Sequence, residues 1–264
     1  MLQASAILVV LAVGQTFVVA TAGIDLSMAS VMTLGAIVLG LTFQATDNIF
    51  LAMLAGVLAA SAVGMLNGTI IAKGGITDFI VTLGALSAAS GLALILADGK
   101  PIQVINRFLL KLSAGGIGPF SWSVIVAAVV AVVAHVALFN SRFGLHVLAT
   151  GGSTESARAV GVLTVRVKIA VYTLSGFLAG IAAILLVARV GAAEPASNTS
   201  FLLNSVAAVV LGGVSLFGGR ATIIGPVMGA LLLTALVNGL TLLGLSQFYQ
   251  PLAVAIIGGT ITST

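Results

Sequence analysis

The residues best suited to a specific task lie in one polar interval, Arg142 to Lys168, between long apolar runs. Ser153 is placed to cap a short helix there, and Glu155 falls in its first turn, where a carboxylate favours the positive end of the helix dipole. Gly161 can end the helix in a left-handed conformation. The chemistry of this group is recognition of another macromolecule, so we expect a soluble partner to dock here.

The same helix carries Ala157 and Arg158. Ala157 and Gly161 lie one turn apart, and we expect them to leave a small surface that a partner's cleft can grip. Arg158 can pair with Glu155, three residues earlier, or with an acid of the partner. The alternative is an ordinary capped loop helix that leads into the next apolar run, and the residues alone leave both interpretations open.

A second candidate group surrounds Asp25, the only acid between Met1 and Thr46. An acid inside a membrane is costly unless it is solvated or paired. With Gly23 and Ser27, Asp25 can line a translocation path or form a hinge, since interrupted helices are tolerated in buried or water-lined places. The simpler interpretation makes Asp25 the N-cap of a helix that contains Ser27.

Three further polar residues within or near the apolar runs are Asn67, Thr82 and Asn204. They are candidates for the same path, although such side chains more often make hydrogen bonds between helices. The two histidines, His135 and His146, have no visible ligand partner, and we expect no metal site. The sequence has no nucleophile–base pair, phosphate-binding glycine loop or nucleic-acid patch, so we expect neither an enzyme nor a nucleic-acid partner.

Apolar helices must position these residues. The chain of 264 residues is 60% hydrophobic and 6% charged, against about 25% charged in soluble domains. A helix needs about 20 apolar residues to cross a bilayer. The sequence therefore predicts an all-α, polytopic helical membrane protein with a single transmembrane domain over residues 1–264. The nine expected spans cover residues 4–22, 27–43, 49–72, 79–97, 121–140, 169–189, 202–217, 222–243 and 250–263.

The Lys and Arg residues predict the orientation, because membrane proteins concentrate them on the cytoplasmic side. If residues 142–168 face the cytosol, alternation of the spans places six of the ten Lys and Arg inside, including Lys73 and Arg220. The four expected outside are Lys100, Arg107, Lys111 and Arg189. The N-terminus then lies outside, which suggests that one earlier span is missing from this chain.

One polar interval falls on the expected outer side, from Asp98 to Pro119. It can be a solvated hairpin with a helical stretch at 103–112, or a landing surface for an external partner. Both interpretations remain open.

Several blocks resemble the ribose-type permeases of ABC importers when they are read in order. Gly23-Ile-Asp-Leu-Ser27 resembles that family's Gly-Gly-Ile-Asp-Leu-Ser signature. Phe79–Gly84 and Gly99–Ile102 match its next recurrent blocks, and Phe143–Arg189 resembles it almost continuously. Ala207–Leu216 completes the series. The resemblance covers nearly the whole chain and preserves the order and spacing of the blocks.

The resemblance implies a type II ABC importer-like permease of about ten spans in the bacterial inner membrane, of which this chain starts at the second. It implies import of a monosaccharide, such as ribose, or of a related small solute by alternating access. The implied partners are a cytosolic ABC ATPase subunit, a periplasmic solute-binding protein, a second permease copy and membrane lipid. ATP would be used by the ATPase subunit, and this chain would bind no cofactor.

In this context residues 142–168 are a cytosolic coupling loop, and its ATPase-coupling residues are Ser153, Glu155, Ala157, Arg158 and Gly161. The competing hypothesis is a secondary carrier or channel for a small polar solute that works without an ATPase. Such a protein would use acids within the membrane as ion or proton sites, and Asp25 alone is a candidate.

Overall fold

A computed structural model describes residues 2–118, 120–196 and 199–244. In this part of the chain, seven helices are long and apolar enough to cross a membrane. They are α1 (Leu2–Ala20), α2 (Met28–Thr46), α3 (Ile49–Gly74), α4 (Asp78–Leu96), α6 (Trp122–Phe139), α9 (Thr164–Val190) and α11 (Ile224–Leu242). The four shorter helices are α5 (Arg107–Ala114), α7 (Arg142–Gly152), α8 (Thr154–Ala159) and α10 (Thr199–Leu211). The predicted polytopic helical fold is confirmed.

The predicted count of nine spans is not confirmed. The span expected at 202–217 is the shorter helix α10, because Gly212 follows it and Gly213 adopts a left-handed conformation with φ of +74°. Its 13 residues rise about 20 Å, less than the ~30 Å of a hydrocarbon core. The span expected at 250–263 lies outside the described residues.

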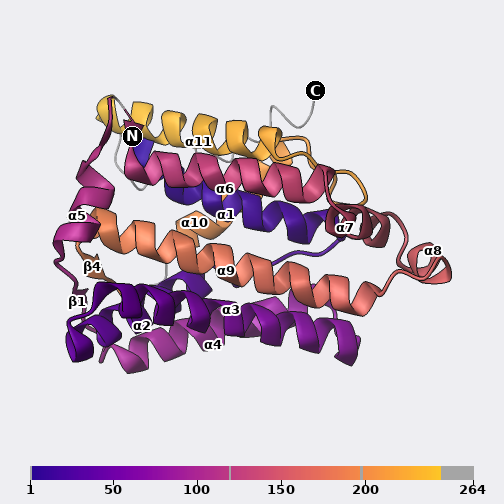
Figure 1. The fold of residues 1–264 in the computed structure, drawn as a ribbon, viewed down its shortest axis with the longest axis horizontal. Helices are drawn as coiled ribbons and strands as arrows, with labels where there is room; N and C mark the ends of the chain where they lie inside the picture. The colour runs from indigo at the N-terminus through magenta and orange to yellow at the C-terminus, as the bar shows by residue number, and fades with distance from the viewer. Residues whose placement is uncertain (1, 119, 197–198, 245–264) are drawn as a thin grey trace.

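The long helices run side by side, with α1 and α9 in the interior of the bundle (Figure 1). Helix α1 is buried on all sides, and α9 packs against α1, α2 and α3. By contrast, less than a third of each of α3, α4, α6 and α11 is buried, and large apolar side chains are exposed on all four. A helix that is apolar all round suits a protein core or a membrane, so the exposed surfaces of these four helices are suited to lipid.

Small residues allow the closest helix contacts, as in many membrane bundles. On the α3–α9 contact, a Cβ added to Gly176 would collide with the carbonyl oxygen of Ala60. On the α10–α11 contact, a Cβ on Gly229 would collide with the carbonyl oxygen of Ala208. Glycine is therefore needed at both places for the backbones to approach.

The charged residues gather at the two ends of the bundle. Helices α7 and α8 lie at one end, and α5 lies at the other (Figure 1). The C-terminal part of α3, which carries Lys73, lines a cavity together with α8, and Gly219, beside Arg220, packs against Gly152 of α7. The six Lys and Arg expected inside therefore share the end that carries α8, which we call the α8 end.

The opposite end is held by short strands. β1 (Ile102–Gln103) pairs antiparallel with β4 (Ala192–Ala193), and β2 (Gly116–Ile117) pairs with β3 (Phe120–Ser121). The β1–β4 ladder joins the segment after α4 to the segment after α9.

The segment 98–118 contains the helical stretch of the expected solvated hairpin, and most of its residues are exposed. Its helix begins at Arg107 rather than near residue 103, because the Asn106 side chain caps it by accepting a hydrogen bond from the backbone N–H of Phe108 at 2.8 Å. Leu109 is buried, and α5 packs against α6 and α9. The segment therefore forms a folded cover over the end of the bundle.

Candidate functional site

Helix α8 has the caps that its sequence predicts. The Ser153 hydroxyl accepts a hydrogen bond from the backbone N–H of Ser156 at 3.2 Å, and Glu155 lies in the first turn. Gly161 follows the helix with φ of +87°. The chain then turns back, because the backbone N–H of Val162 donates to the carbonyl oxygen of Ala157 at 2.9 Å. The helix is thus defined at both ends by local interactions.

Only part of the small surface expected from Ala157 and Gly161 is present, because Gly161 is exposed but Ala157 is only 3% exposed. Its methyl group faces the protein as the chain folds back after the helix. The apolar side chains that stand out near α8 are Val160, which is 79% exposed, and Leu163, which is 59% exposed. Both side chains are therefore accessible to a partner that docks at this helix.

Arg158 does not pair with Glu155. Its guanidinium Nε donates to the Thr164 hydroxyl at 2.9 Å, and Thr164 is the first residue of α9. The turn at Gly161 brings the start of α9 beside Arg158, so the arginine has a partner within reach that the spacing along α8 does not reveal. This bond ties α8 to the long helix that follows it.

A buried polar cluster lies deeper in the bundle. One carboxylate oxygen of Asp25 accepts from the Ser27 N–H at 2.9 Å and from its hydroxyl at 2.6 Å, and the other accepts from the Ser175 hydroxyl at 2.7 Å. The Asn67 amide donates to the Ser27 hydroxyl at 3.0 Å. We call Asp25, Ser27, Asn67 and Ser175 the Asp25 cluster. Its hydrogen bonds offset the cost of burying a carboxylate.

The cluster lies near the middle of α9. Ser175 is eleven residues beyond Thr164 in a helix of 27 residues, which places it about 16 Å along the axis at 1.5 Å per residue. The non-helical connection 21–27 therefore reaches well into the bundle to bring Asp25 there. Polar groups at such a depth need partners within the protein.

Asp25 is not the N-cap that the simpler interpretation assigned. Helix α2 begins at Met28, and Ser27, which precedes it, lies outside the helix. The Asp25 carboxylate satisfies the N–H of Ser27, which comes before the first helical turn, while its second oxygen is held by Ser175 on α9. One carboxylate oxygen thus bonds to Ser27 and the other to Ser175, and the carboxylate does not cap the first turn of α2.

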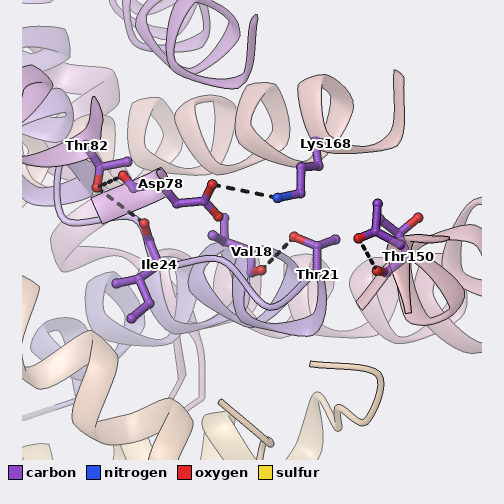
Figure 2. A network of polar contacts seen from close by, with 8 residues as sticks. Val18, Thr21, Ile24, Asp78, Thr82, Thr150 and Lys168 are labelled. Carbon is purple, nitrogen blue, oxygen red and sulfur yellow. Dashed lines mark hydrogen bonds and ion pairs between the residues drawn. The ribbon is translucent and has the colours of Figure 1, made fainter. Parts of the chain in front are cut away.

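Two other candidates lie beside the same connection. The Thr82 hydroxyl donates to the carbonyl oxygens of Asp78 at 2.8 Å and of Ile24 at 3.3 Å, so α4 is bonded to the connection (Figure 2). A Cβ on Gly23 would stand 2.5 Å from the Asp78 carboxylate and 2.8 Å from the Tyr172 hydroxyl oxygen. A side chain at position 23 would therefore require these two polar groups to shift.

An ion pair that the sequence reasoning missed joins α4 to α9. The Lys168 ammonium lies 3.7 Å from the Asp78 carboxylate, and the two side chains are 23% and 15% exposed (Figure 2). Sequence spacing offers no reason to pair these two residues, which are 90 positions apart. The sequence feature that could have drawn attention to the pair is the position of Lys168 at the edge of an apolar run, one helical turn before Tyr172.

A cavity of about 510 Å³ opens at the α8 end. Three segments line it, 22–24, 71–79 and 154–168, and Asp78, Lys168 and Arg158 are among its walls. Of the residues predicted for a path or hinge, the structure gathers Gly23, Asp25, Ser27, Asn67 and Thr82 around the connection 21–27. Asn204 lies half-buried on α10, and no described hydrogen bond joins it to the Asp25 cluster.

Helix α9 connects the two groups of candidate residues. Across residues 2–118, 120–196 and 199–244, no group of three or more His, Asp or Glu side chains is placed to hold a metal ion. The two predicted groups, at α8 and around Asp25, are instead joined by the first half of α9.

The chain is similar in sequence to several known membrane transport proteins. The profile of the family described as "Branched-chain amino acid transport system / permease component" matches residues 1–262. The ribose import permease protein RbsC of Escherichia coli (strain K12) is 35% identical over 264 residues, 97% of this chain and 81% of that protein. The L-arabinose ABC transporter permease protein AraH of Azospirillum brasilense is 37% identical over 243 residues, 91% of this chain and 71% of that protein.

A third relative is the D-allose transport system permease protein AlsC of Escherichia coli (strain K12). It is 31% identical over 258 residues, 97% of this chain and 78% of that protein. No solved structure matches the chain.

Proposed function

The chain belongs to the family of permease components of branched-chain amino acid transport systems, and from this we propose that it is the membrane subunit of an ATP-driven importer for a monosaccharide or a related small solute. The observation that carries the proposal is the similarity to permeases named for ribose, arabinose and allose over at least nine tenths of this chain. The protein is a multi-pass protein of the bacterial inner membrane.

Residues 142–168 form the cytosolic coupling segment in this proposal, and α8 is the contact with an ABC ATPase subunit. Ser153 and Gly161 fix the ends of the helix, Glu155 stands on its exposed side, and buried Ala157 anchors it. Exposed Val160 and Leu163 supply apolar contact area beside the helix. Arg158 then connects any movement of α8 to α9 through Thr164.

The connection 21–27 is the proposed hinge of the translocation path. Gly23, Asp25 and Ser27 hold it in a non-helical form, Asn67 and Thr82 bond to it from α3 and α4, and Asn204 remains a separate candidate on α10. Alternating access requires two packed states whose balance each partner biases. A hydrogen-bonded break between two helices is a suitable place for such a change.

The remaining partners follow from the same family assignment. A periplasmic solute-binding protein would dock at the end that carries α5, and a second permease copy would complete the membrane part. ATP would be consumed by the ATPase subunit, and this chain would contribute no cofactor. The end that carries α8 would face the cytosol, consistent with its six Lys and Arg.

A secondary carrier that works without an ATPase has less support. It would need Asp25 as an ion or proton site, and both oxygens of that carboxylate are already occupied by hydrogen bonds from Ser27 and Ser175.

The test is transport by the purified complex in proteoliposomes. The chain is reconstituted with an ABC ATPase subunit and a solute-binding protein from the same organism, and uptake of ribose, arabinose, allose and leucine is measured with and without ATP. We expect ATP-dependent uptake of one of the sugars. Uptake that needs no ATP would refute the importer, and ATP-dependent uptake of leucine alone would refute the sugar assignment.

The docking role of α8 is tested by co-purification with the ATPase subunit. Val160→Asp places a charge in the exposed apolar contact and is expected to weaken the association. The matched control is Val132→Asn, on the exposed side of α6 within the membrane part, and it should leave the association unchanged. Equal association of both variants and of the unmodified chain would refute the assigned contact.

A further inference from the structure

Four polar side chains follow one face of α9 from the coupling helix to the buried centre of the bundle. Thr164, Lys168, Tyr172 and Ser175 are spaced by four, four and three residues, which places them on one side of a helix. Arg158 of α8 donates to Thr164, and Ser175 donates to Asp25 at the other end of the series. We call these four residues the α9 polar face.

The middle of this face meets α4 and the connection 21–27. Lys168 pairs with Asp78, the first residue of α4. The Tyr172 hydroxyl and the Asp78 carboxylate both converge on Gly23, where a Cβ would lie within 3 Å of each. The α9 polar face therefore touches both α4 and the connection 21–27.

The Asp78–Lys168 ion pair links α4 to α9 at the α8 end. Helix α4 packs mainly against α2 and α3. The ion pair bridges α4 to α9 across the wall of the cavity, with both charged groups mostly shielded from water. Shielded charges interact more strongly than exposed ones, so the two helices are held together at this point.

From this geometry we propose that Asp78 and Lys168 are positioning residues for transport, and that their ion pair transmits movement of α8 and α9 to α4 and the hinge. The pair stays closed through the transport cycle and acts as a link, not as a gate that opens. The inference rests on the proposed function, because it assigns a path for the motion that the ATPase subunit would deliver to α8.

The first test measures solute uptake and ATP hydrolysis in parallel in the reconstituted complex. The solute is ribose, or whichever sugar the proteoliposome test identifies as transported. Asp78→Asn and Lys168→Met remove one charge each with little change in side-chain size. We expect both variants to bind the ATPase subunit and hydrolyse ATP, while the solute taken up per ATP falls by at least about fivefold. The charge-exchanged double variant, Asp78→Lys with Lys168→Asp, should recover at least half of the ratio.

The control is a polar side chain of α4 that lies outside the ion pair. The exposed Ser87 hydroxyl donates to the carbonyl oxygen of Leu83 in the same helix at 3.4 Å. Ser87→Ala removes that hydroxyl and should leave the ratio unchanged. Single variants at Asp78 and Lys168 with the wild-type ratio would overturn the inference, and so would a double variant that recovers nothing.

A second measurement separates the link from damage to the fold. The chain has no cysteine, so Asp78→Cys with Lys168→Cys introduces the only two thiols. The same preparation is assayed before and after a short bifunctional thiol reagent joins them. A closed link predicts that cross-linking raises the uptake per ATP, and an unchanged or lower ratio would overturn it. Failure of the proposed function is distinct, because the unmodified complex would then show no ATP-driven uptake.

Discussion

Removal of the Ser175 hydroxyl is expected to weaken the core of the bundle measurably. Ser175 is fully buried and is the donor that holds the second carboxylate oxygen of Asp25, 150 residues away in sequence. In Ser175→Ala that oxygen keeps no donor from α9. A hydrogen bond to a charged group contributes about 1.5–3 kcal/mol, so we expect the free energy of unfolding to fall by about 2 kcal/mol.

The assay is thermal unfolding of the purified chain in detergent, followed by the loss of the monodisperse peak in size-exclusion chromatography. At about 2–4 °C per kcal/mol for a chain of this size, Ser175→Ala should lower the Tm by about 4–8 °C. The control is Thr173→Val on the same helix, whose hydroxyl bonds only to the backbone carbonyl of Ile169. Its Tm should change by about 1 °C or less.

A double-mutant cycle with Asp25→Asn tests whether the two residues act through each other. Once Asp25 is changed, removing the Ser175 hydroxyl should cost less than it does in the unmodified chain, because the partner carboxylate is gone. Equal Tm values for Ser175→Ala and Thr173→Val, or strictly additive effects in the cycle, would refute the assignment of Ser175 as a partner of Asp25.

Three other predictions concern close contacts and the α8 cap. Gly23→Ala should lower stability by about 1–3 kcal/mol through overpacking against Asp78 and Tyr172. Its control is Gly84→Ala, whose added methyl group meets no atom within 4 Å and which should have a Tm no lower than the unmodified chain. Equal Tm values for the two variants would contradict the close approach at Gly23. Gly176→Leu should prevent α3 and α9 from packing, seen as loss of the monodisperse peak, and a normal peak would contradict that contact. Ser153→Ala should destabilise α8 by about 1 kcal/mol, detected as faster amide exchange in residues 154–159, and unchanged exchange would show that the cap is dispensable.

The sequence was informative where structure depends on neighbours along the chain. Charge-free runs located the seven long helices because a bilayer requires uninterrupted apolar length. The α8 cap followed from Ser153 and the end of the helix from Gly161, since both devices act within a few residues. These features need no knowledge of the tertiary fold.

Features that depend on distant partners were missed or misassigned. The sequence left Asp25 open between a path or hinge residue and a local cap, because Ser175, 150 residues away, leaves no signal near it. The Asp78–Lys168 pair spans 90 positions, and Arg158 turned to Thr164 only because the chain reverses between them. Charge and spacing along the chain do not show whether a polar side chain bonds to a distant residue or to water.

Helix α7 was missed for a related reason. Its sequence, Arg142–Gly152, mixes polar and apolar residues and reads as a loop. In the fold, Phe143 meets Phe17 of α1, with ring centroids 6.2 Å apart, and a Cβ on Gly144 would collide with the backbone of Leu138. Tertiary packing selects this helix.

The short β1–β4 ladder gives α4 and α9 a second tie, at the end opposite to Asp78 and Lys168. Ile102 pairs with Ala193, and the N–H of Val104 donates to the carbonyl oxygen of Gly191 at 2.9 Å. The ion pair and the ladder thus connect the two helices at points roughly one helix length apart, although the helices are far apart in sequence. With α4 and α9 connected at both ends, a tilt of α9 at one membrane face also displaces the segment after α4 at the other face. Movements at the two ends of the protein are therefore coupled.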